Sequence, residues 1–349
     1  MDGQRGAILG VDQEFSPGKL IQVLPSRQNK TAVDSCVGRR RIILAIQTVT
    51  TEQKKTDPEQ LGIVPPAASY HFMDLPKTRL HYMQCGDGEP LVMVPATISK
   101  LENWRALAQF MGQHFRVYFF ELPGHGKSSP FPEPFRTRLV AETVEAFINR
   151  LRHKTVSLMG FSFGGILTLE TLRLLQDRVQ KVVLLAPALT KQALQFEKFH
   201  LWLVRSAVKV LKQPSVRSGL LRLIRSKRFS PVTAALLTRF SNLEKNISMD
   251  KVFHNITDNT ADVLSYQLDE LLNFEPTVSS APFPQPCYLA MSVNDPVLDF
   301  DTTVDVVGSQ FSHVHVERFT HHYHQPPHVL SFNEIFRKYN PLLDYIVSN

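Results

Sequence analysis

Ser162 lies in the segment Gly160-Phe161-Ser162-Phe163-Gly164, between an apolar run and a helical pattern. A serine on a sharp strand-to-helix turn projects its hydroxyl away from the backbone, and the helix N-terminus offers N–H groups to a developing oxyanion. The two glycines leave room for the close backbone approaches of such a turn. A glycine-rich packing loop is the alternative, but the strand–turn–helix order favours a nucleophilic serine.

A serine hydroxyl at neutral pH is a poor nucleophile, so it needs a base, which in turn needs an orienting acid. In a doubly wound sheet these groups follow the carboxyl ends of later strands. Asp295 comes directly after the predicted strand Cys287–Ser292, on a turn set by Pro296. Asp299 and Asp301 are alternative candidates for the acid, but residues of this type at these positions also serve in turns or as helix caps. Asp295 is therefore the predicted acid.

The base is expected after the next strand, which ends at Phe319 and is followed by Thr320-His321-His322-Tyr323-His324. The strand order leaves both His321 and His322 open as the base. His324 is interpreted as a loop residue. Serine, aspartate and histidine then each follow a strand, in that order along the chain, which is a more specific pattern than any one of the three placements.

The elements that must position these residues alternate along the chain. The apolar and helical periodicities predict strands over 70–75, 79–85, 91–94, 117–122, the run ending at Gly160, 179–185, 287–292 and 314–319. They predict helices over 101–111, 140–151, 166–175, 302–310 and from about His328, the last one broken at Pro341. Such alternation predicts an α/β fold with a mostly parallel sheet covered by helices on both faces.

Four segments organise the chain. Residues 1–66 are rich in polar residues and are expected to be an irregular extension, in which the apolar patch near Ile42–Ile46 could form one strand. Residues 67–189 and 282–349 form the two parts of the predicted core. Residues 190–281 interrupt the alternation and have helical patterns throughout, so they predict an inserted helical cap.

Composition narrows the class of protein. The chain has 349 residues, a formal net charge of +7 and a pI near 9.3. Its three cysteines form no Cys-x-x-Cys motif and indicate reduced thiols, so a cytoplasmic location is expected. Neither a membrane-spanning run nor a secretory signal is evident. Basic residues alternate with Leu and Ile rather than with aromatic residues, so nucleic acid is not an expected partner. We expect no metal and no cofactor.

The combined motifs resemble the α/β-hydrolase superfamily, in its lidded branch of esterases, lipases, thioesterases and acyltransferases. Besides the serine turn, the segment from Glu121 to Ser128 resembles the family's D-x-P-G-H-G-x-S sequence, and Asn294-Asp295-Pro296-Val297 resembles its acid turn. The resemblance covers about residues 69–188 and 282–349. It implies a doubly wound, mostly parallel eight-stranded sheet, with the cap between strands six and seven.

The resemblance also implies an oxyanion hole formed by the backbone N–H groups of Phe163 and Thr97. The family usually has His-Gly after strand three, whereas this chain has Pro95-Ala96. Proline has no N–H group, but the donor that is needed lies two residues later.

The resemblance also favours one of the two candidate bases. Thr320-His321 resembles the Gly-His that precedes the last helix in α/β hydrolases, and this resemblance implies His321 as the base, with His322 as the alternative.

The cap has an amphipathic segment over 199–211. Its basic residues share one stripe, namely Lys198, Arg205, Lys209 and Lys212. The stripe is explained by a solvated outer face, and it would also fit a peripheral contact with an anionic membrane or an acidic acyl carrier. The apolar side, with Leu203, Ala207, Val210 and Leu211, is expected to line an acyl pocket.

These features predict a lipase-like serine hydrolase that cleaves a small-molecule carboxylic ester or thioester through an acyl-enzyme. Acyl transfer and cofactor-free perhydrolysis would use the same triad. A ligand-binding module with a vestigial triad is the alternative from another class.

Overall fold

The computed structural model describes residues 43–48, 58–98, 100–225, 257–276 and 281–348. Most of the predicted extension 1–66 therefore lies outside the described residues. The strands are β1 (Ile43–Thr48), β2 (Ala68–Leu75), β3 (Thr78–Cys85), β4 (Glu89–Val94), β5 (Phe115–Phe120), β6 (Val156–Phe161), β7 (Val179–Leu185), β8 (Cys287–Ser292) and β9 (His313–Phe319). The helices are α1 (Leu101–Met111), α2 (Thr137–Leu151), α3 (Gly164–Leu175), α4 (Lys198–Leu211), α5 (Pro214–Arg225), α8 (Asp258–Asn273), α9 (Phe300–Gln310) and α10 (Phe332–Ser348), with 3-10 turns at Gln176–Arg178 and Lys191–Ala193.

The strands form one sheet in the order β1-β9-β8-β7-β6-β4-β5-β3-β2. Antiparallel pairing is confined to the neighbours of β3, and the other described pairs are parallel. Strands β2 to β9 confirm the predicted eight-stranded, mostly parallel sheet. Strand β1 adds a ninth at the edge, where Ile43 pairs with His313. The apolar patch of the N-terminal segment thus forms the strand that its sequence allowed.

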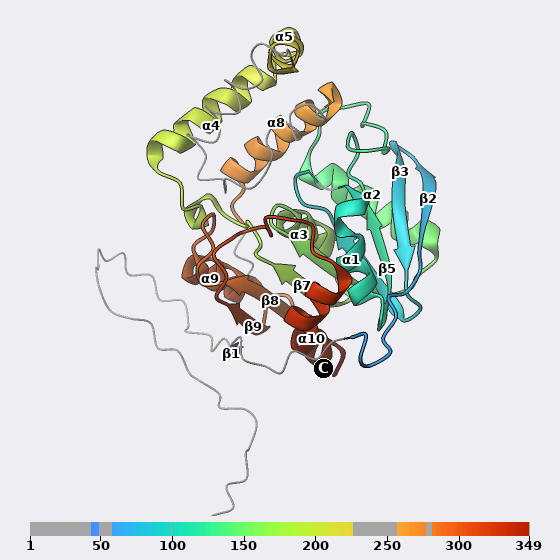
Figure 1. Cartoon of the computed structure of the whole chain (residues 1–349). Coiled ribbons are helices and arrows are strands. Elements are labelled where there is room, and N and C mark those ends of the chain that lie inside the picture. The colour runs from blue at the N-terminus through green and yellow to red at the C-terminus, as the bar shows by residue number, and fades with distance from the viewer. Residues whose placement is uncertain (1–42, 49–57, 99, 226–256, 277–280, 349) are drawn as a thin grey trace, which may run out of the picture.

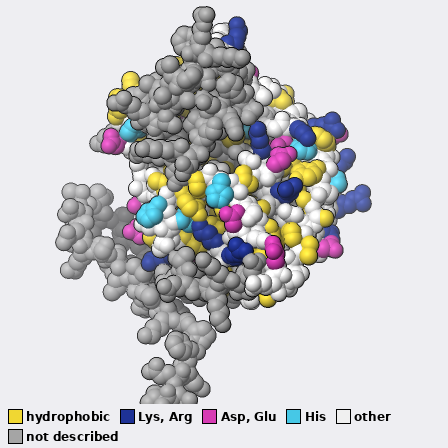
Figure 2. Space-filling view, viewed as in Figure 1, with side chains coloured by type: hydrophobic (Ala, Val, Ile, Leu, Met, Phe, Trp, Pro, Cys, Tyr) yellow, Lys and Arg dark blue, Asp and Glu magenta, His cyan; other side chains and the backbone are white. Residues whose placement is uncertain are grey.

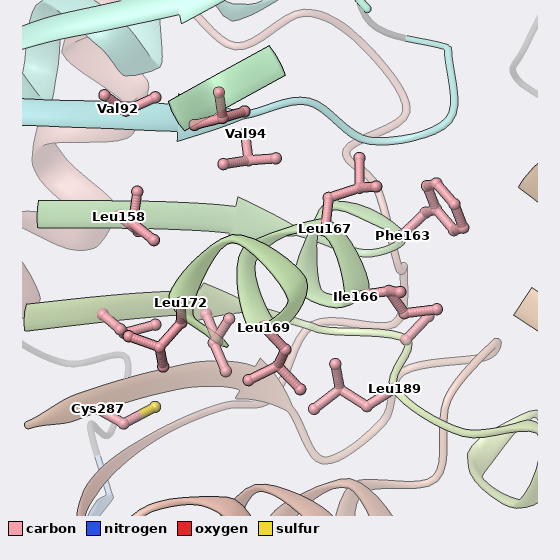
Figure 3. Close-up of a cluster of buried hydrophobic side chains, with 14 of the residues drawn as sticks. Val92, Val94, Leu158, Phe163, Ile166, Leu167, Leu169, Leu172, Leu189 and Cys287 are labelled. Carbon is pink, nitrogen blue, oxygen red and sulfur yellow. The ribbon is translucent and has the colours of Figure 1, made fainter. Parts of the chain in front are cut away.

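Helices cover both faces of the sheet (Figure 1). Successive residues of a central strand point to opposite faces, so they belong to different hydrophobic clusters. Leu158 packs in the cluster that contains α2, α3 and α9, whereas Met159 packs in the cluster with α1 and α10. Strands buried on both faces consist of almost continuous apolar runs, as β6 and β8 do. Figure 3 shows the first cluster, where Ile166, Leu169 and Leu172 of α3 lie against the sheet.

Helix α10 differs from the prediction. It begins at Phe332 rather than near His328, and it continues through Pro341 to Ser348. A proline inside a helix removes one backbone hydrogen bond. Here Phe336 before the proline and Leu343 after it are both buried in the same cluster, so packing on the sheet keeps the two halves together.

The described cap helices α4, α5 and α8 come between β7 and β8 and lie beyond one edge of the sheet (Figure 1). Charged side chains hold them together. The buried Arg217 of α5 forms ion pairs with Asp258 and Asp262 of α8, and Lys212 pairs with Asp269. Helix α8 therefore lies against both outer helices.

The predicted inward face of α4 is wrong by part of a turn. Ala207 and Val210 are exposed, whereas Leu211 is partly buried as predicted. The other side chains of α4 that face inward are Leu201, Val204 and Val208. The sequence could not separate these faces because most positions of α4 are apolar. Arg205 and Lys209 of the basic stripe are exposed, as expected.

Over the face shown in Figure 2, Lys and Arg side chains are interspersed with acidic and hydrophobic ones. The positive net charge is therefore not gathered into one continuous basic surface on that face. No helix among the described residues has the length and apolar character needed to cross a bilayer.

Candidate active site

Ser162 occupies the turn between β6 and α3 with a φ of 53°, in the left-handed region. Its backbone N–H donates to Leu185 O at 3.0 Å, and its carbonyl accepts hydrogen bonds from Gly165 and Ala188. These bonds hold a conformation that is unfavourable for a residue with a Cβ atom. Ser162 therefore lies on a sharp turn between a strand and a helix.

Gly160 and Gly164 of the turn have no room for a side chain. A Cβ atom on Gly160 would lie 2.3 Å from Thr168 Oγ1. A Cβ atom on Gly164 would lie 2.6 Å from Val94 O and 2.8 Å from Pro95 O. The loop after β4 therefore passes directly against the start of α3.

Asp295 lies in a buried turn after β8, as predicted. Its Oδ1 atom accepts hydrogen bonds from the backbone N–H groups of Val297, at 2.8 Å, and Leu298, at 3.0 Å. Its Oδ2 atom accepts one from His324 Nδ1 at 2.7 Å. Burial by itself would raise the pKa of Asp295, but His324 and the two backbone donors lower it overall. Asp295 is therefore ionised at neutral pH.

The histidine between acid and serine is His324. Its Nε2 atom lies 2.8 Å from Ser162 Oγ, while Nδ1 contacts Asp295. With Nδ1 protonated and donating to the carboxylate, Nε2 is the acceptor for the serine proton. The imidazole also stacks on Phe161, with ring centroids 5.3 Å apart. The ring is thus held on three sides.

The prediction of His321 as the base is wrong in this geometry. The Nδ1–H of His321 donates to Tyr323 O at 3.0 Å, and its ring stacks on Tyr323 at 4.0 Å. Burial, together with the charge of Lys338, lowers the pKa of His321 to about 4. The alternative, His322, is exposed. Neither imidazole contacts Ser162 or Asp295.

The physical reason is the distance across the sheet. Strand β9, which precedes the histidine loop, is three strand positions from β6, which carries the serine. Neighbouring strands are about 4.8 Å apart, so the loop must cover roughly 14 Å. His321 is two residues past the end of β9, whereas His324 is five residues past it. The strand order, together with the number of residues between β9 and each histidine, is therefore the information that would have identified His324 as the base.

The two expected oxyanion donors lie at the same edge. Phe163 follows the nucleophile at the N-terminal end of α3, and Thr97 follows the loop that packs on Gly164. Within the described ranges, no residue accepts a hydrogen bond from either backbone N–H group. Their role in an oxyanion hole remains a proposal.

Glu121, in the position of the family's aspartate, forms hydrogen bonds that hold the turn after β5. The buried carboxylate accepts hydrogen bonds from His81 Nδ1 at 2.9 Å and from the Lys127 N–H at 2.7 Å. A Cβ atom on Gly126 would lie 2.1 Å from its Cδ atom. Glu121 therefore organises the turn after β5. No cluster of potential metal ligands occurs among the residues that the structure describes.

Comparison with known proteins agrees with this architecture. The family model described as "alpha/beta hydrolase fold" matches residues 89–324. The chain belongs to the alpha/beta hydrolase family. The match ends at the histidine that contacts Ser162, so it includes the three hydrogen-bonded residues.

Individual curated proteins are similar to only part of this chain. An (E)-2-((N-methylformamido)methylene)succinate hydrolase from Acinetobacter baylyi is 27% identical over 30% of this chain and 40% of its own length. A pimeloyl-[acyl-carrier protein] methyl ester esterase from Nitrosospira multiformis is 29% identical over 30% of this chain and 41% of its own length. The aligned part is thus less than half the length of these curated relatives. The structure of a haloalkane dehalogenase from Agrobacterium tumefaciens matches with a TM-score of 0.58 and 15% identity, over 80% of this chain and 95% of that one. This last likeness concerns the fold alone.

Proposed function

We propose that this α/β hydrolase is a serine hydrolase that cleaves a carboxylic ester or thioester through an acyl-enzyme intermediate. The observation that supports this proposal is the unbroken hydrogen-bonded chain from Asp295 through His324 to Ser162. The serine at the turn is what separates this proposal from haloalkane dehalogenation, which would proceed through an alkyl ester on a carboxylate.

The first half-reaction acylates the serine. His324 Nε2 takes the proton as Ser162 Oγ attacks the substrate carbonyl carbon. Asp295, whose pKa is lowered, stays ionised and stabilises the imidazolium that forms. The N–H groups of Phe163 and Thr97 would stabilise the oxyanion. When the tetrahedral intermediate collapses, the bond to the alcohol or thiol breaks and His324 returns the proton to that leaving group.

The second half-reaction repeats these steps with water as the nucleophile. His324 deprotonates the water that attacks the acyl-enzyme, and the carboxylic acid leaves as Ser162 regains its proton. Transfer to an alcohol or to hydrogen peroxide would differ only in the attacking group.

The test is labelling with a fluorophosphonate, read by intact mass and by peptide mapping. We expect one label on Ser162 in the parent and no label in Ser162→Ala. A folded parent that takes up no label would contradict the proposal and would favour a binding module with a vestigial triad. Acyl transfer is distinguished by product analysis in the presence of added alcohols.

A further inference from the structure

Helix α8 of the cap contacts the catalytic core directly. Val263 packs so closely on Gly124 that a Cβ atom there would lie 2.7 Å from Val263 Cγ2. Two turns further along α8, Glu270 accepts a hydrogen bond from Thr137 Oγ1 at 3.2 Å. Gly124 lies in the segment between β5 and α2, and Thr137 is the first residue of α2, so both core residues follow the carboxyl end of β5. The α8 face that carries Val263 and Glu270 therefore covers the edge where Ser162 lies.

Gln267 lies on that same face of α8. It is four residues after Val263 and three before Glu270, which places the three side chains on one side of the helix. The residue is completely buried, with 0% exposure. Neither its Nε2 atom nor its Oε1 atom has a hydrogen-bond partner among the described residues. Burying an unpaired amide destabilises a protein, so this side chain does not contribute to stability, and within the described ranges its polar atoms are free to bind another group.

The face around Gln267 is otherwise largely apolar. Val263 of α8 belongs to the same buried cluster as Leu122, Phe135 and Phe163. The rings of Phe135 and Phe163 have centroids 6.4 Å apart. Because Phe163 directly follows the nucleophile, this cluster extends from the serine turn to the cap. Gln267 is thus a polar group in a mostly apolar boundary between cap and core.

A second unpartnered polar group lies at this boundary. His125 follows Gly124, the residue on which Val263 packs, and it is 2% exposed. Its Nε2 atom has no hydrogen-bond partner in the described part of the chain. Burial lowers the pKa of His125 to about 4, so the imidazole is neutral at pH 7. Two uncharged groups with free hydrogen-bonding capacity therefore flank the same contact.

We propose that Gln267, assisted by His125, forms a subsite that recognises an uncharged hydrogen-bonding group on the substrate, such as an amide or a hydroxyl. This inference rests on the proposed function, because it concerns the acyl chain that Ser162 receives. A neutral amide and a neutral imidazole match an uncharged polar group, and an anion would gain no opposite charge from them. A site that pairs such groups discriminates strongly against an analogue that leaves them unpaired.

The test compares esters matched in length. p-Nitrophenyl 4-acetamidobutanoate is compared with the heptanoate, and 6-acetamidohexanoate with the nonanoate, in the parent and in Gln267→Leu. We expect the parent to prefer at least one acetamido ester over its alkyl match. Gln267→Leu should lower kcat/KM for that ester by about tenfold or more, while the alkyl ester changes by less than about threefold. The thermal midpoint should rise, because an unpaired buried amide is removed.

Gln213→Leu is the matched control, since it makes the same chemical change at an exposed position of the cap. It should leave the ester preference unchanged. A labelled and active parent without any acetamido preference would overturn the subsite alone. Equal losses on both ester classes in Gln267→Leu would also overturn it. If the parent neither hydrolyses any ester nor takes up fluorophosphonate, the proposed function and the subsite both fail.

The outer face of α4 carries two exposed aromatic side chains. Phe199 is 56% exposed and Trp202 is 60% exposed, and their rings stack with centroids 6.0 Å apart. Arg205 and Lys209 follow one and two turns later and are exposed as well. A helix with exposed aromatic and basic residues on one face is typical of binding at a lipid interface.

We infer that this face of α4 binds an anionic phospholipid surface, since its aromatic rings suit the interface and its two cations complement the lipid charge. Vesicles of phosphatidylcholine with phosphatidylglycerol should bind the parent more tightly at low salt than vesicles of phosphatidylcholine alone. Binding should shift the emission of Trp202 to shorter wavelength. The pairs Phe199→Ser with Trp202→Ser, and Arg205→Glu with Lys209→Glu, should each weaken binding about tenfold.

Phe72→Ser is the control, because it removes an exposed ring from the edge strand β2 rather than from α4. It should bind like the parent. A parent that ignores anionic vesicles at low salt would overturn this inference and leave the stripe as a solvated face. Unchanged binding by both double variants would overturn it as well.

Discussion

His324 Nε2 lies 2.8 Å from Ser162 Oγ although the strands that precede the two residues, β9 and β6, are separated by two other strands. The loop after β9 therefore crosses the ends of β8 and β7 before the imidazole meets the serine. Asp295, which follows β8, contacts the same ring on the way. This crossing determines which of the three neighbouring histidines can act as the base.

We expect His324→Ala to lower kcat for p-nitrophenyl ester hydrolysis by about 10³-fold or more, because it removes the proton acceptor of Ser162. His321→Ala should retain activity within about tenfold of the parent, since its ring packs on Tyr323 and does not contact the serine. Steady-state kinetics at pH 7.5 measure both. Loss of activity in His321→Ala alone would refute the assignment.

Asp295→Asn should lower kcat by about 10⁴-fold, because an amide no longer holds the required tautomer of His324. Asp299→Asn is the control, since Asp299 caps α9 through Thr302 and has no contact with the histidine. We expect the control to keep its activity and to lose about 1 kcal/mol of stability at most.

The lowered pKa of Asp295 also predicts an acid-dependent stability. Because its pKa is lower in the folded than in the unfolded state, its contribution is complete above the unfolded pKa of about 3.9. The contribution is lost as the pH falls through the lower, folded value. Urea unfolding between pH 7 and pH 2 should therefore show a smaller acid-induced loss in Asp295→Asn than in the parent. An identical loss would contradict the folded-state ionisation.

Gly126→Ala should destabilise the protein by about 2–4 kcal/mol, because the new methyl group would meet the carboxylate of Glu121 and the backbone has a φ of 52°. Gly62→Ala is a matched control, with a φ of 66° and no atom within 4 Å of the added Cβ. It should cost about 1 kcal/mol, from backbone strain alone. The difference between their free energies of unfolding in urea isolates the steric clash.

Arg217→Met should loosen the cap, because it leaves Asp258 and Asp262 without their shared cation. Because the two carboxylates are partly exposed, the loss of stability should be smaller than the cost of about 3–5 kcal/mol for removing one partner of a fully buried ion pair. Limited proteolysis should then cut within the cap faster than in Arg222→Met, whose side chain is exposed. Equal rates of cleavage would show that the ion pairs do not hold α5 on α8.

Local sequence patterns were sufficient to predict the sheet, the turn that carries Ser162 and the position of Asp295. These features depend on neighbours along the chain, namely an apolar strand followed by a tight turn. Val156 to Gly164 and Cys287 to Asp295 carry that local information, so both positions could be predicted. The strand near Ile43 was also visible as an apolar patch, but its place beside β9 was not.

Three features could not be predicted locally, namely the histidine that contacts Ser162, the buried face of α4 and the continuation of α10 past Pro341. Each depends on distances between segments that are remote in sequence. His321, His322 and His324 are equivalent in a local pattern, and the number of strands that the loop crosses separates them. Gln267 looks like any polar helix residue in the sequence, and only packing shows that its buried amide has no partner within the described ranges. Local patterns encode which elements form, whereas the spacing between packed elements selects the side chains that meet.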